Sequence, residues 1–352
     1  MSGRVYRAAI VGCGRKAATI DDEERCRINY SVPPDAHAAA YAQVPRVALV
    51  AAADPNESKR RLMQERWKVP AVYADYREML ARERPDVVSV TTRTALHAEV
   101  TVAAAAAGAK GVLCEKAIAS SLAEADEMVD ACRRARCQLV INHTRRWHPT
   151  YHRAIHALRD GAIGRLRCIV GLCPGPLIHN GTHLFDLMRF FAGDVAWLTG
   201  HVQPGTGEDL PGRAMLLFQN GAVGFVDVDS SLGFAMELQG SEGRMFIDPA
   251  EEGLIIWEYR SPPPPADRAW YQGGPCKART ARLLTGSAAS GTQVAAVEDL
   301  IDCIEGNRES RSSGHDGRAA LELALAVYHS HANGGERLAL PLRDRALRVH
   351  SR

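Results

Sequence analysis

Residues 7–17 read RAAIVGCGRKA, and this stretch decides the fold that we predict for the chain. Residues 7–11 are an apolar run typical of a buried strand, and they lead directly into a GxGxxA pattern that begins at Gly12. In dinucleotide-binding folds the first glycine permits a tight turn, and the second, here Gly14, lets the backbone approach a pyrophosphate. The small third residue, Ala17, lets the helix pack on the strand. The pattern is common on its own, so its context decides its meaning.

A second apolar run supports a dinucleotide site. Residues 47–53 (VALVAAA) end at Asp54, whose carboxylate can accept both hydroxyls of an adenosine ribose and would repel a 2′-phosphate. Asp54 follows the glycines by about 40 residues instead of the usual 20 or so, because residues 19–34 look inserted. This acidic insertion is either a solvated face or part of a lid over the substrate.

Three more strand-like runs occur at the spacing of βα units, at residues 87–91, 111–114 and 138–141. Helical segments lie between them, including residues 95–108 and a helix that begins near Ser121, where Glu124 is available for a capping box. Strands that alternate with helices predict a doubly wound parallel sheet. The βα pattern stops after His143, so residues 1–143 are predicted to form a first, Rossmann-type domain.

The run at residues 111–114 ends in an adjacent acid and base, Glu115 and Lys116. In an open parallel sheet, ligands bind beyond the carboxyl ends of the strands, so an ionisable pair there indicates a site. The alternative is a salt-bridged lysine that merely ends a strand. Thr92 and His97 follow the preceding strand at the same edge of the sheet. His97 is either a surface residue at a helix N-terminus or part of the site.

Residues 144–352 are predicted to form a second α/β domain. Strand-like runs with Gly and Asn turns between them predict a mainly antiparallel meander, at residues 166–172, 214–218, 222–228, 236–238, 244–247 and 254–257. Helices are expected at residues 149–159, from about His183, at 294–304 and at 318–332. The proline-rich residues 261–291 are the least structured stretch, and Trp270 within them belongs to an arm or to loop packing.

Histidines recur at helical spacing, at His148, His152 and His156 and again at His179 and His183. Imidazoles one helical turn apart can chelate a metal. No cysteine or acid stands at ligand spacing beside them, so we predict no metal site. His183 and Asp186 are expected on the polar side of one helix, away from an apolar stripe.

The composition is that of an ordinary globular chain. Its 352 residues are too many for one core and predict two domains. A net charge of +2 gives no argument for a nucleic acid or a membrane surface as partner. The chain shows neither an apolar run of about 18 residues nor the apolar core of a signal peptide, so neither a membrane span nor export is expected. Nine scattered cysteines without a CxxC pair fit reduced thiols in the cytoplasm.

Taken together, these motifs resemble the Gfo/Idh/MocA family of nicotinamide-dependent oxidoreductases over nearly the whole chain. The residues that carry the resemblance are Gly12-Cys13-Gly14, Asp54, Leu96-His97, Cys114-Glu115-Lys116, and the stretches 145–149 (RRWHP), 161–164 (GAIG), 181–187 (GTHLFDL), 240–243 (GSEG) and 316–320 (DGRAA). The resemblance implies a Rossmann domain followed by an α/β domain with an open sheet that often mediates oligomers. A homodimer or homotetramer is therefore expected.

The resemblance also implies that Lys116 and His183 flank the substrate carbon beside C4 of the nicotinamide. Two positions differ from the family pattern. Ala117 follows the lysine where proline is usual, which removes the easy route to a cis peptide. His179 stands where many members carry Asp, and it is either an alternative proton acceptor or a substrate contact.

The predicted site residues fall into two overlapping groups. The predicted cofactor-binding residues are Gly12, Cys13, Gly14, Arg15, Lys16, Asp54, Thr92, His97, Glu115, Lys116 and Arg145. The predicted substrate-binding residues are Lys116, Arg146, Trp147, His179, Asn180, Thr182 and His183, of which Lys116, His183 and His179 are the predicted catalytic residues. Because Asp54 is followed by Pro55 and Asn56 without an arginine to hold a phosphate, NAD is expected rather than NADP. Lys59, Arg60 and Arg61 lie near enough to weaken that preference.

Oxidation of a secondary alcohol requires a base, because the hydroxyl proton must leave with the hydride. A lysine can serve only if its pKa falls; burial beside a cationic nicotinamide would lower the pKa of Lys116, and Glu115 would oppose this. The predicted function is an NAD-dependent dehydrogenase of a sugar, aminosugar or cyclitol, with the ring preference resting on the resemblance. Two alternatives are an NAD-dependent glycosidase that uses transient oxidation and a non-catalytic dinucleotide-binding regulator. Retention of Lys116 and His183 argues against the regulator.

Overall fold

The structure of the chain is a computed structural model that describes residues 4–23, 33–248, 253–258, 281–283 and 291–350. Most of the predicted insertion at residues 19–34 lies outside the described residues. The same is true of most of the proline-rich stretch at residues 261–291, including Trp270.

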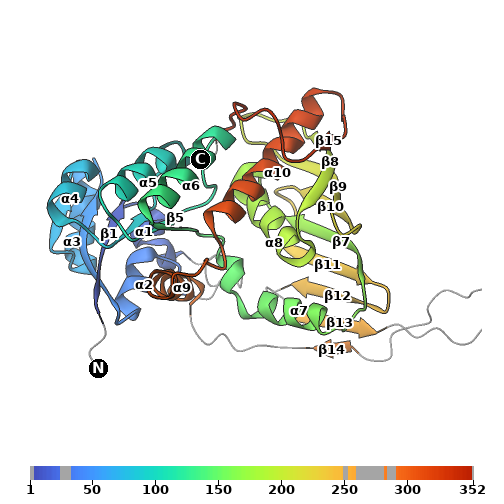
Figure 1. Cartoon of the computed structure of the whole chain (residues 1–352), viewed down its shortest axis with the longest axis horizontal. Helices are drawn as coiled ribbons and strands as arrows, with labels where there is room; N and C mark the ends of the chain where they lie inside the picture. Colours follow the sequence, from blue (N-terminus) through green and yellow to red (C-terminus); the bar gives the residue numbers. More distant parts are fainter. Residues whose placement is uncertain (1–3, 24–32, 249–252, 259–280, 284–290, 351–352) are drawn as a thin grey trace, which may run out of the picture.

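A parallel six-stranded sheet forms the core of the first domain, as the βα pattern predicts (Figure 1). Its strands are β1 (Tyr6–Val11), β2 (Val47–Ala53), β3 (Ala71–Tyr73), β4 (Val87–Val90), β5 (Gly111–Cys114) and β6 (Gln138–Ile141). The strand order β3-β2-β1-β4-β5-β6 reverses direction between β1 and β4. In doubly wound sheets the ligand crevice lies at this switch point, beyond the carboxyl ends of the strands. The three-residue strand β3 was not predicted, because its apolar run is too short to stand out.

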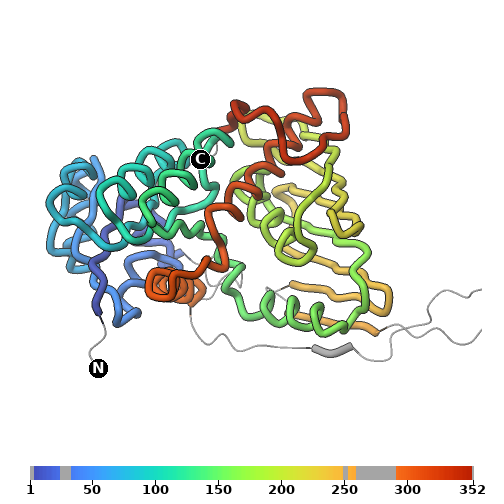
Figure 2. Tube along the Cα trace, viewed as in Figure 1, coloured from blue at the N-terminus to red at the C-terminus, as the bar shows by residue number. Residues whose placement is uncertain are grey.

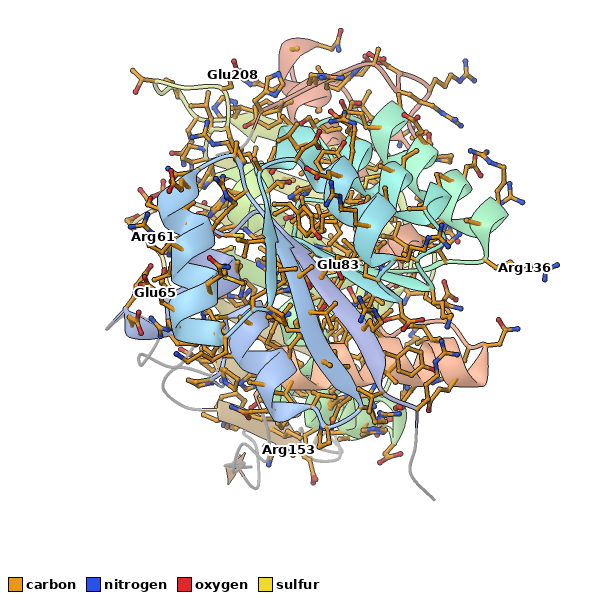
Figure 3. The ribbon with its side chains drawn as sticks, turned by 90° about the vertical axis from the view of Figure 1, so that its left-hand side faces the viewer. Arg61, Glu65, Glu83, Arg136, Arg153 and Glu208 are labelled. Carbon is orange, nitrogen blue, oxygen red and sulfur yellow. The ribbon has the colours of Figure 1, made fainter. Side chains whose placement is uncertain are left out.

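Helices cover both faces of this sheet. They are α1 (Arg15–Ala18), α2 (His37–Gln43), α3 (Glu57–Trp67), α4 (Tyr76–Glu83), α5 (His97–Ala106) and α6 (Leu122–Ala135). The side chain of Ser121 accepts from the backbone N–H of Glu124 and so caps α6, which confirms the predicted start of this helix. Figure 3 shows Arg61 and Glu65 of α3 at the periphery. These charged side chains therefore face solvent and do not contribute to the ligand crevice.

The second domain contains a mixed sheet of nine strands among the described residues, in the order β14-β13-β12-β11-β7-β10-β9-β8-β15. The strands are β7 (Leu166–Cys173), β8 (Val195–Val202), β9 (Gly212–Phe218), β10 (Val223–Val228), β11 (Ala235–Gly240), β12 (Gly243–Asp248), β13 (Gly253–Glu258), β14 (Ala281–Leu283) and β15 (Leu338–Ala339). Only β7 and β10 pair in parallel within this part of the chain. The predicted, mainly antiparallel pairing is therefore confirmed. The predicted meander is wrong in one respect, because β7 lies between β10 and β11, which follow each other in the chain. Strands β8, β14 and β15 were not predicted.

One face of the second sheet packs against helices. The helices of this region are α7 (Pro149–Arg159), α8 (Thr182–Ala192) and α10 (Gly314–Ala332). In Figure 1, α8 and α10 lie between this sheet and the first domain. Helix α10 begins four residues before the predicted start at 318, because Ser313 and Asp316 form a reciprocal capping box.

Helix α9 (Thr292–Gly306) returns to the first domain after the chain has completed most of the second sheet. Its apolar residues Val297, Leu300 and Ile301 belong to the same core cluster as Leu113 of β5. Figure 2 shows this helix, in orange, beside the blue N-terminal part of the chain. The division of the chain after His143 stays a prediction about folding units, but in space α9 covers the first sheet.

Candidate active site

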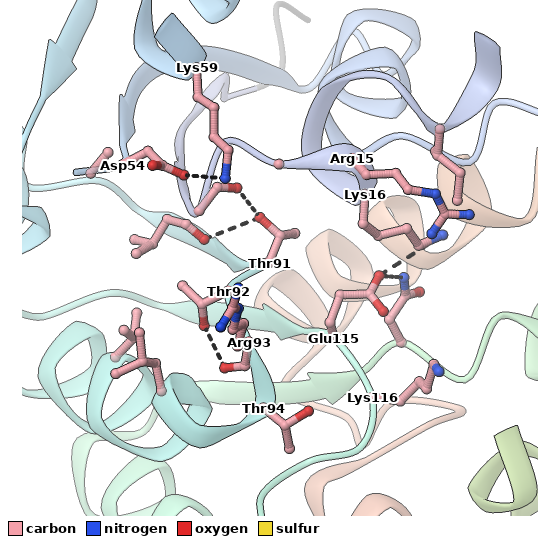
Figure 4. A pocket seen from close by; sticks show the side chains of 18 of the residues that line it. Arg15, Lys16, Asp54, Lys59, Thr91, Thr92, Arg93, Thr94, Glu115 and Lys116 are labelled. Carbon is pink, nitrogen blue, oxygen red and sulfur yellow. Dashed lines mark hydrogen bonds and ion pairs between the residues drawn. The ribbon is translucent and has the colours of Figure 1, made fainter. Parts of the chain in front are cut away.

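A pocket of about 730 Å³ lies between the two domains, along the carboxyl ends of the first sheet. Its walls include Gly12, Asp54 and Thr92 from the first domain and His179 and His183 from the second. Figure 4 shows the first-domain side of this pocket. The reversal of strand order between β1 and β4 places the crevice here, which is where doubly wound folds bind their ligands.

The glycine turn forms the cofactor end of the pocket. Gly12 has a φ of +92°, and a Cβ at this position would lie 2.8 Å from the backbone carbon of Thr91, so only glycine fits. A Cβ on Gly14 would meet no atom within 4 Å, so the backbone there faces open space where a pyrophosphate can approach. Arg15 and Lys16 also line the pocket. The turn therefore fits a dinucleotide.

Asp54 is more constrained than its predicted role requires. Its carboxylate accepts hydrogen bonds from the backbone N–H groups of Cys13 and Asn56, both at 2.9 Å. The Lys59 ammonium lies 3.8 Å from Asp54 Oδ2, as Figure 4 shows. Carboxylate oxygens carry further lone pairs, so Asp54, which lines the pocket, retains acceptor capacity for a ribose. Cys13, predicted as a cofactor contact, instead buries its side chain in the core and holds Asp54 through its N–H.

His97 is not the surface residue that one interpretation expected. Its side chain is buried and does not line the pocket, so that interpretation is wrong, while the cofactor contact stays a prediction. Its Nδ1 lies 2.8 Å from the carbonyl oxygen of Ala117, and its Nε2 lies 3.2 Å from that of Thr92. His97 thus joins the segment after β4 to the segment after β5. The peptide bond between Lys116 and Ala117 is cis although proline is absent.

Glu115 lies on the floor of the pocket in a buried polar network. One carboxylate oxygen accepts a hydrogen bond from the Asn142 amide at 2.6 Å and lies 3.1 Å from His37 Nε2. Lys16 lies 4.0 Å from the same oxygen, and Figure 4 shows it pointing there. Burial would raise the pKa of Glu115, but the Lys16 charge and the bonds to His37 and Asn142 bring it below the usual range. Glu115 therefore stays ionised.

Lys116 projects from the end of β5 and reaches the second domain. Its ammonium donates to the backbone carbonyl of His179, and no carboxylate of the described residues lies within ion-pair distance of it. The salt-bridged alternative is therefore wrong. Burial lowers the pKa of Lys116 to about 8, and Glu115 opposes that shift. A lysine with this pKa is partly neutral near neutral pH and can accept a proton.

His183 approaches the same pocket from α8. The side chain lines the pocket, while its Nδ1 is buried and makes no hydrogen bond with any described residue. Burial, followed by the charges of Arg145 and Lys116, lowers the pKa of His183 well below its usual value. His183 is therefore neutral at pH 7. His179 and Asn180 line the same end from a π-helical turn, η5 (Leu177–Gly181).

Several predicted substrate contacts are structural instead. The Arg146 guanidinium is buried and grips Asp186 with two hydrogen bonds of 2.8 Å, and it also donates to Asp316 at 3.1 Å. Trp147 packs in the core of the first domain, and the Thr182 hydroxyl donates to the carbonyl of Ile178. None of these three predicted residues lines the pocket, because each is committed to partners within the fold.

Arg145, predicted as a cofactor contact, lies beside the pocket without lining it. Its guanidinium carbon is 3.8 Å from the centre of the Phe234 ring, a cation–π contact. Its charge lowers the pKa of both His183 and Lys116. Arg145 therefore acts on the site through its electrostatic field.

His143 adjoins the site without lining the pocket, and the sequence did not reveal it. It is buried, its Nδ1 lies 3.4 Å from Asp186 Oδ1, and its ring packs edge to face on His183 with 5.6 Å between the ring centres. In the sequence it marked only the end of the first domain. The available clue was its place: a polar residue two positions after a buried strand, at the same sheet edge as Lys116. Tyr76, Asn142 and Thr144, which do line the pocket, were not predicted either.

The histidine series does not form a metal centre. His148 caps α7 by accepting from the N–H of Thr150 at 3.2 Å, and His152 Nε2 lies 2.6 Å from the carbonyl oxygen of Arg146. Across the described ranges, no group of three or more His, Cys, Asp or Glu side chains is arranged to hold a metal. The absence of a functional metal stays a prediction.

A Rossmann sheet with a glycine turn, joined to a second sheet domain across a pocket that holds a lysine and a histidine, defines a class of two-domain dinucleotide-dependent oxidoreductases. Comparison with protein-family models identifies the member of that class. The chain belongs to the Gfo/Idh/MocA oxidoreductase family: the model of its NAD-binding Rossmann fold matches residues 31–143, and that of its C-terminal alpha/beta domain matches residues 173–340.

Relatives and solved structures agree with this assignment. The D-apiose dehydrogenase of Paraburkholderia graminis is 27% identical over 364 residues, which cover 94% of this chain and 88% of that protein. The myo-inositol 2-dehydrogenase of Thermotoga maritima is 26% identical over 246 residues, 62% of this chain and 73% of that protein. A levoglucosan dehydrogenase in complex with NADH and L-sorbose shares the fold, with a TM-score of 0.78 and 19% identity, covering 96% of this chain and 100% of that one.

Proposed function

We propose that this oxidoreductase is an NAD-dependent dehydrogenase of a secondary hydroxyl or keto carbon in a sugar, aminosugar or cyclitol. The observation that carries the proposal is the meeting of Lys116 and His183, from different domains, at one pocket beside the glycine turn. The curated relatives bear the names of a D-apiose and a myo-inositol dehydrogenase, which supports a polyhydroxylated substrate.

The chemistry follows from the two protonation states. When bound, NAD supplies the hydride acceptor. Neutral Lys116 takes the hydroxyl proton as the carbonyl forms, and the pKa of about 8 keeps this form accessible. Neutral His183 presents its second ring nitrogen to the substrate, where it can accept a hydrogen bond from a hydroxyl and orient the substrate ring. In the reverse direction protonated Lys116 returns the proton, so the same pair serves oxidation and reduction.

We further propose a preference for NAD over NADP, with Asp54 as its cause. Its carboxylate is fixed by two backbone N–H groups on the pocket wall, where it would repel a 2′-phosphate. The Arg60 guanidinium, a nearby phosphate ligand in principle, donates instead to the carbonyls of Asp54 and Pro55. Titration of the protein with NADH and NADPH tests this, and equal or tighter NADPH binding would contradict it.

A substrate screen tests the activity itself. The protein is incubated with NAD and single sugars, aminosugars or cyclitols, and the absorbance of reduced nicotinamide is followed. We expect NADH to form with at least one member of these classes. Cleavage of a glycoside without net NADH would instead support the glycosidase alternative. A protein that binds NADH but converts no member of the panel would favour the regulator.

We propose that a second copy of the chain covers the face of the second sheet that has no helix of the described residues packed on it. Phe225 and Met215 face each other across β10 and β9, and they are 45% and 36% exposed. An apolar patch on a sheet suits a two-fold interface, because the same patch serves both copies. Analytical ultracentrifugation should show a homodimer or homotetramer that Phe225→Glu weakens; an unchanged assembly would reject this interface.

We also propose a cytoplasmic location. All seven cysteines within the described residues are free, which fits a reducing compartment. None of the helices in the described residues combines the length and apolar character needed to span a bilayer. Fractionation of cells that express the tagged protein tests the location.

A further inference from the structure

We propose that His143 is a positioning residue, which together with Asp186 fixes the tautomer and orientation of His183. This inference rests on the proposed function, in which His183 accepts a hydrogen bond from a substrate hydroxyl. Three side chains form the array: Asp186 on α8, His143 after β6, and His183 on α8. His143 belongs to the first domain and contacts two residues of the second, Asp186 and His183. The array therefore also connects the two domains beside the pocket.

The array begins at a fixed anion. Asp186 has no exposed surface, and Arg146 holds both of its carboxylate oxygens at 2.8 Å. Burial alone would lower the pKa of Arg146, but the charge and hydrogen bonds of Asp186 raise it above its usual value, so the pair is ionised. An ionised carboxylate only accepts hydrogen bonds. The nitrogen of His143 that faces it, Nδ1, lies 3.4 Å away without a hydrogen bond in this structure, and it can bond to the carboxylate only when it carries the proton.

The tautomer of His143 then determines what its other nitrogen can do. Burial lowers the pKa of His143, although the Asp186 charge opposes this, so the ring is neutral. A neutral imidazole with its proton on Nδ1 has a bare Nε2, which is an acceptor. This Nε2 is buried and makes no hydrogen bond within the described part of the chain.

His183 presents the complementary group. Its buried Nδ1 also lacks a hydrogen bond to any described residue, while the side chain lines the pocket, so Nε2 is the nitrogen available to a ligand. For Nε2 to accept a hydrogen bond, Nδ1 must carry the proton and needs an acceptor. The bare Nε2 of His143 is that acceptor. The rings lie 5.6 Å apart at 71°, so the N–H···N bond forms after a small side-chain rotation or through one water.

A packing role would not explain this arrangement. Burying ring nitrogens without hydrogen bonds destabilises a fold, and a leucine or phenylalanine would fill the space without that cost. A pair of nitrogens that become bonded once His183 turns toward a ligand does explain it. Hydrogen bonds of catalytic groups are often loose before the substrate binds. Asp186 has no exposed surface, so the array orients His183 and does not carry protons to solvent.

A double-mutant cycle tests whether His143 acts through His183. Turnover is measured for wild type, His143→Leu, His183→Ala and the double variant, with whichever of D-apiose, myo-inositol and levoglucosan the wild type oxidises fastest. We expect His143→Leu to lower kcat by about 10- to 100-fold alone and by less than about threefold in the His183→Ala background, since residues that act as a unit are not additive. Equal losses in both backgrounds would overturn the proposal.

Two further variants separate positioning from folding. His143→Gln keeps a donor toward Asp186 and an acceptor toward His183, so it should recover most of the activity lost in His143→Leu. His148→Leu removes another largely buried histidine that has no contact with His183 and should leave kcat near the wild-type value. NADH affinity should stay within about threefold in all of them, well below the kcat effect. A glutamine variant as impaired as the leucine variant would contradict the proposal.

A measurement on the unmodified protein needs no substrate. In protein labelled with 15N-histidine, the ring nitrogen shifts distinguish protonated from bare nitrogens, and His183 is assigned by the loss of its peaks in His183→Ala. We expect a proton on Nδ1 and a bare Nε2 in His183. A proton on Nε2 would overturn this inference alone, whereas normal turnover in His183→Ala would overturn the proposed function.

Discussion

The two ends of the pocket differ in how their polar groups are satisfied. At the cofactor end, Asp54 accepts from two backbone N–H groups, and Glu115 is bound by Asn142. At the substrate end, His183 Nδ1 and both ring nitrogens of His143 make no hydrogen bond with the described residues. Asp54 and Glu115 are buried, as are His183 and His143, so the contrast is not one of burial.

This difference indicates that the polar groups at the two ends are arranged differently before a ligand binds. Among Asp54, Glu115 and Asn142 at the cofactor end, only Asn142 Oδ1 is a buried polar atom without a hydrogen-bond partner in the described part of the chain, and both carboxylates are bonded. Carboxylates that are bonded before binding present a fixed surface, which suits the invariant shape of a dinucleotide. Groups with unused hydrogen-bonding capacity can complete their bonds when a substrate arrives. Substitutions at the cofactor end should therefore change cofactor binding, and those at the substrate end should change turnover.

The largest effect is expected at the substrate end. Removal of a positioned proton-transfer group typically costs about 10² to 10⁴ in rate, so Lys116→Ala and His183→Ala should each lower kcat by this range while NADH affinity changes little. His179→Ala should cost about tenfold or less, because its neighbour one turn later makes the direct contact. Steady-state kinetics and separate NADH titrations measure both quantities.

Lys110→Ala is the matched control, because Lys110 forms an ion pair of 2.7 Å with Asp86 away from the pocket. Near-normal turnover in Lys116→Ala would remove the assignment of the base. A His179 variant less active than the His183 variant would mean that the two histidines have exchanged roles.

The pH profile should follow Lys116. Only the neutral amine accepts a proton, so kcat/KM for oxidation should rise about tenfold per pH unit below pH 8 and level off above it, given the pKa of about 8. The pKa of His183 lies well below its usual value, so no second step is expected between pH 7 and 8. Lys116→Arg, which stays protonated, should lose the rising limb. A wild-type profile that is flat from pH 6 to 9 would contradict the role of Lys116.

A smaller effect is expected at the cofactor end. Asp54→Asn removes the charge and keeps one oxygen; because Cys13 and Asn56 bond to different carboxylate oxygens, only one of these two N–H groups keeps its acceptor. NADPH affinity should therefore rise toward that of NADH by about tenfold, the scale of one partly screened charge repulsion. Turnover with NADH at saturation should change little. Asp54→Ala is the comparison, since it leaves both N–H groups without their acceptor. Unchanged NADPH binding in both variants would show that the Asp54 carboxylate does not cause the preference for NAD.

The smallest effect is expected from metal removal. Treatment with EDTA followed by dialysis should leave kcat unchanged, because Lys116 supplies the proton acceptor and His148 and His152 are bonded within the fold. Loss of activity with recovery on addition of zinc would show that a metal completes the substrate end.

The residues that could be predicted have partners close in sequence or follow a regular pattern. Gly12 and Asp54 stand at the ends of apolar runs, and the positions of β5 and β6 were predicted to the residue. His143 could not be assigned a role, because its partner Asp186 lies on another domain. His97 was misread because its partners are carbonyls of two separate loops.

The resemblance to a family identified residues in or near the site, but it did not identify the role of each residue. Arg146 was predicted to bind substrate, yet its guanidinium is occupied by Asp186 and Asp316. Trp147 likewise fills the core. A motif identifies a segment near the site. Only the three-dimensional contacts show which of its side chains line the pocket and which support the surrounding structure.

The return of α9 to the first sheet has a consequence for how such chains can recombine. Leu300 lies 2.7 Å from the position that a Cβ on Gly111 would take, so this helix closes over β5. Most of the second sheet is in effect an insertion between β6 and α9, because among its described strands only β15 follows α9. A single crossover after residue 143 would pair the nucleotide-binding strands of one parent with a covering helix from another. Chimeras between relatives should therefore retain their cores only when both segments are inherited together.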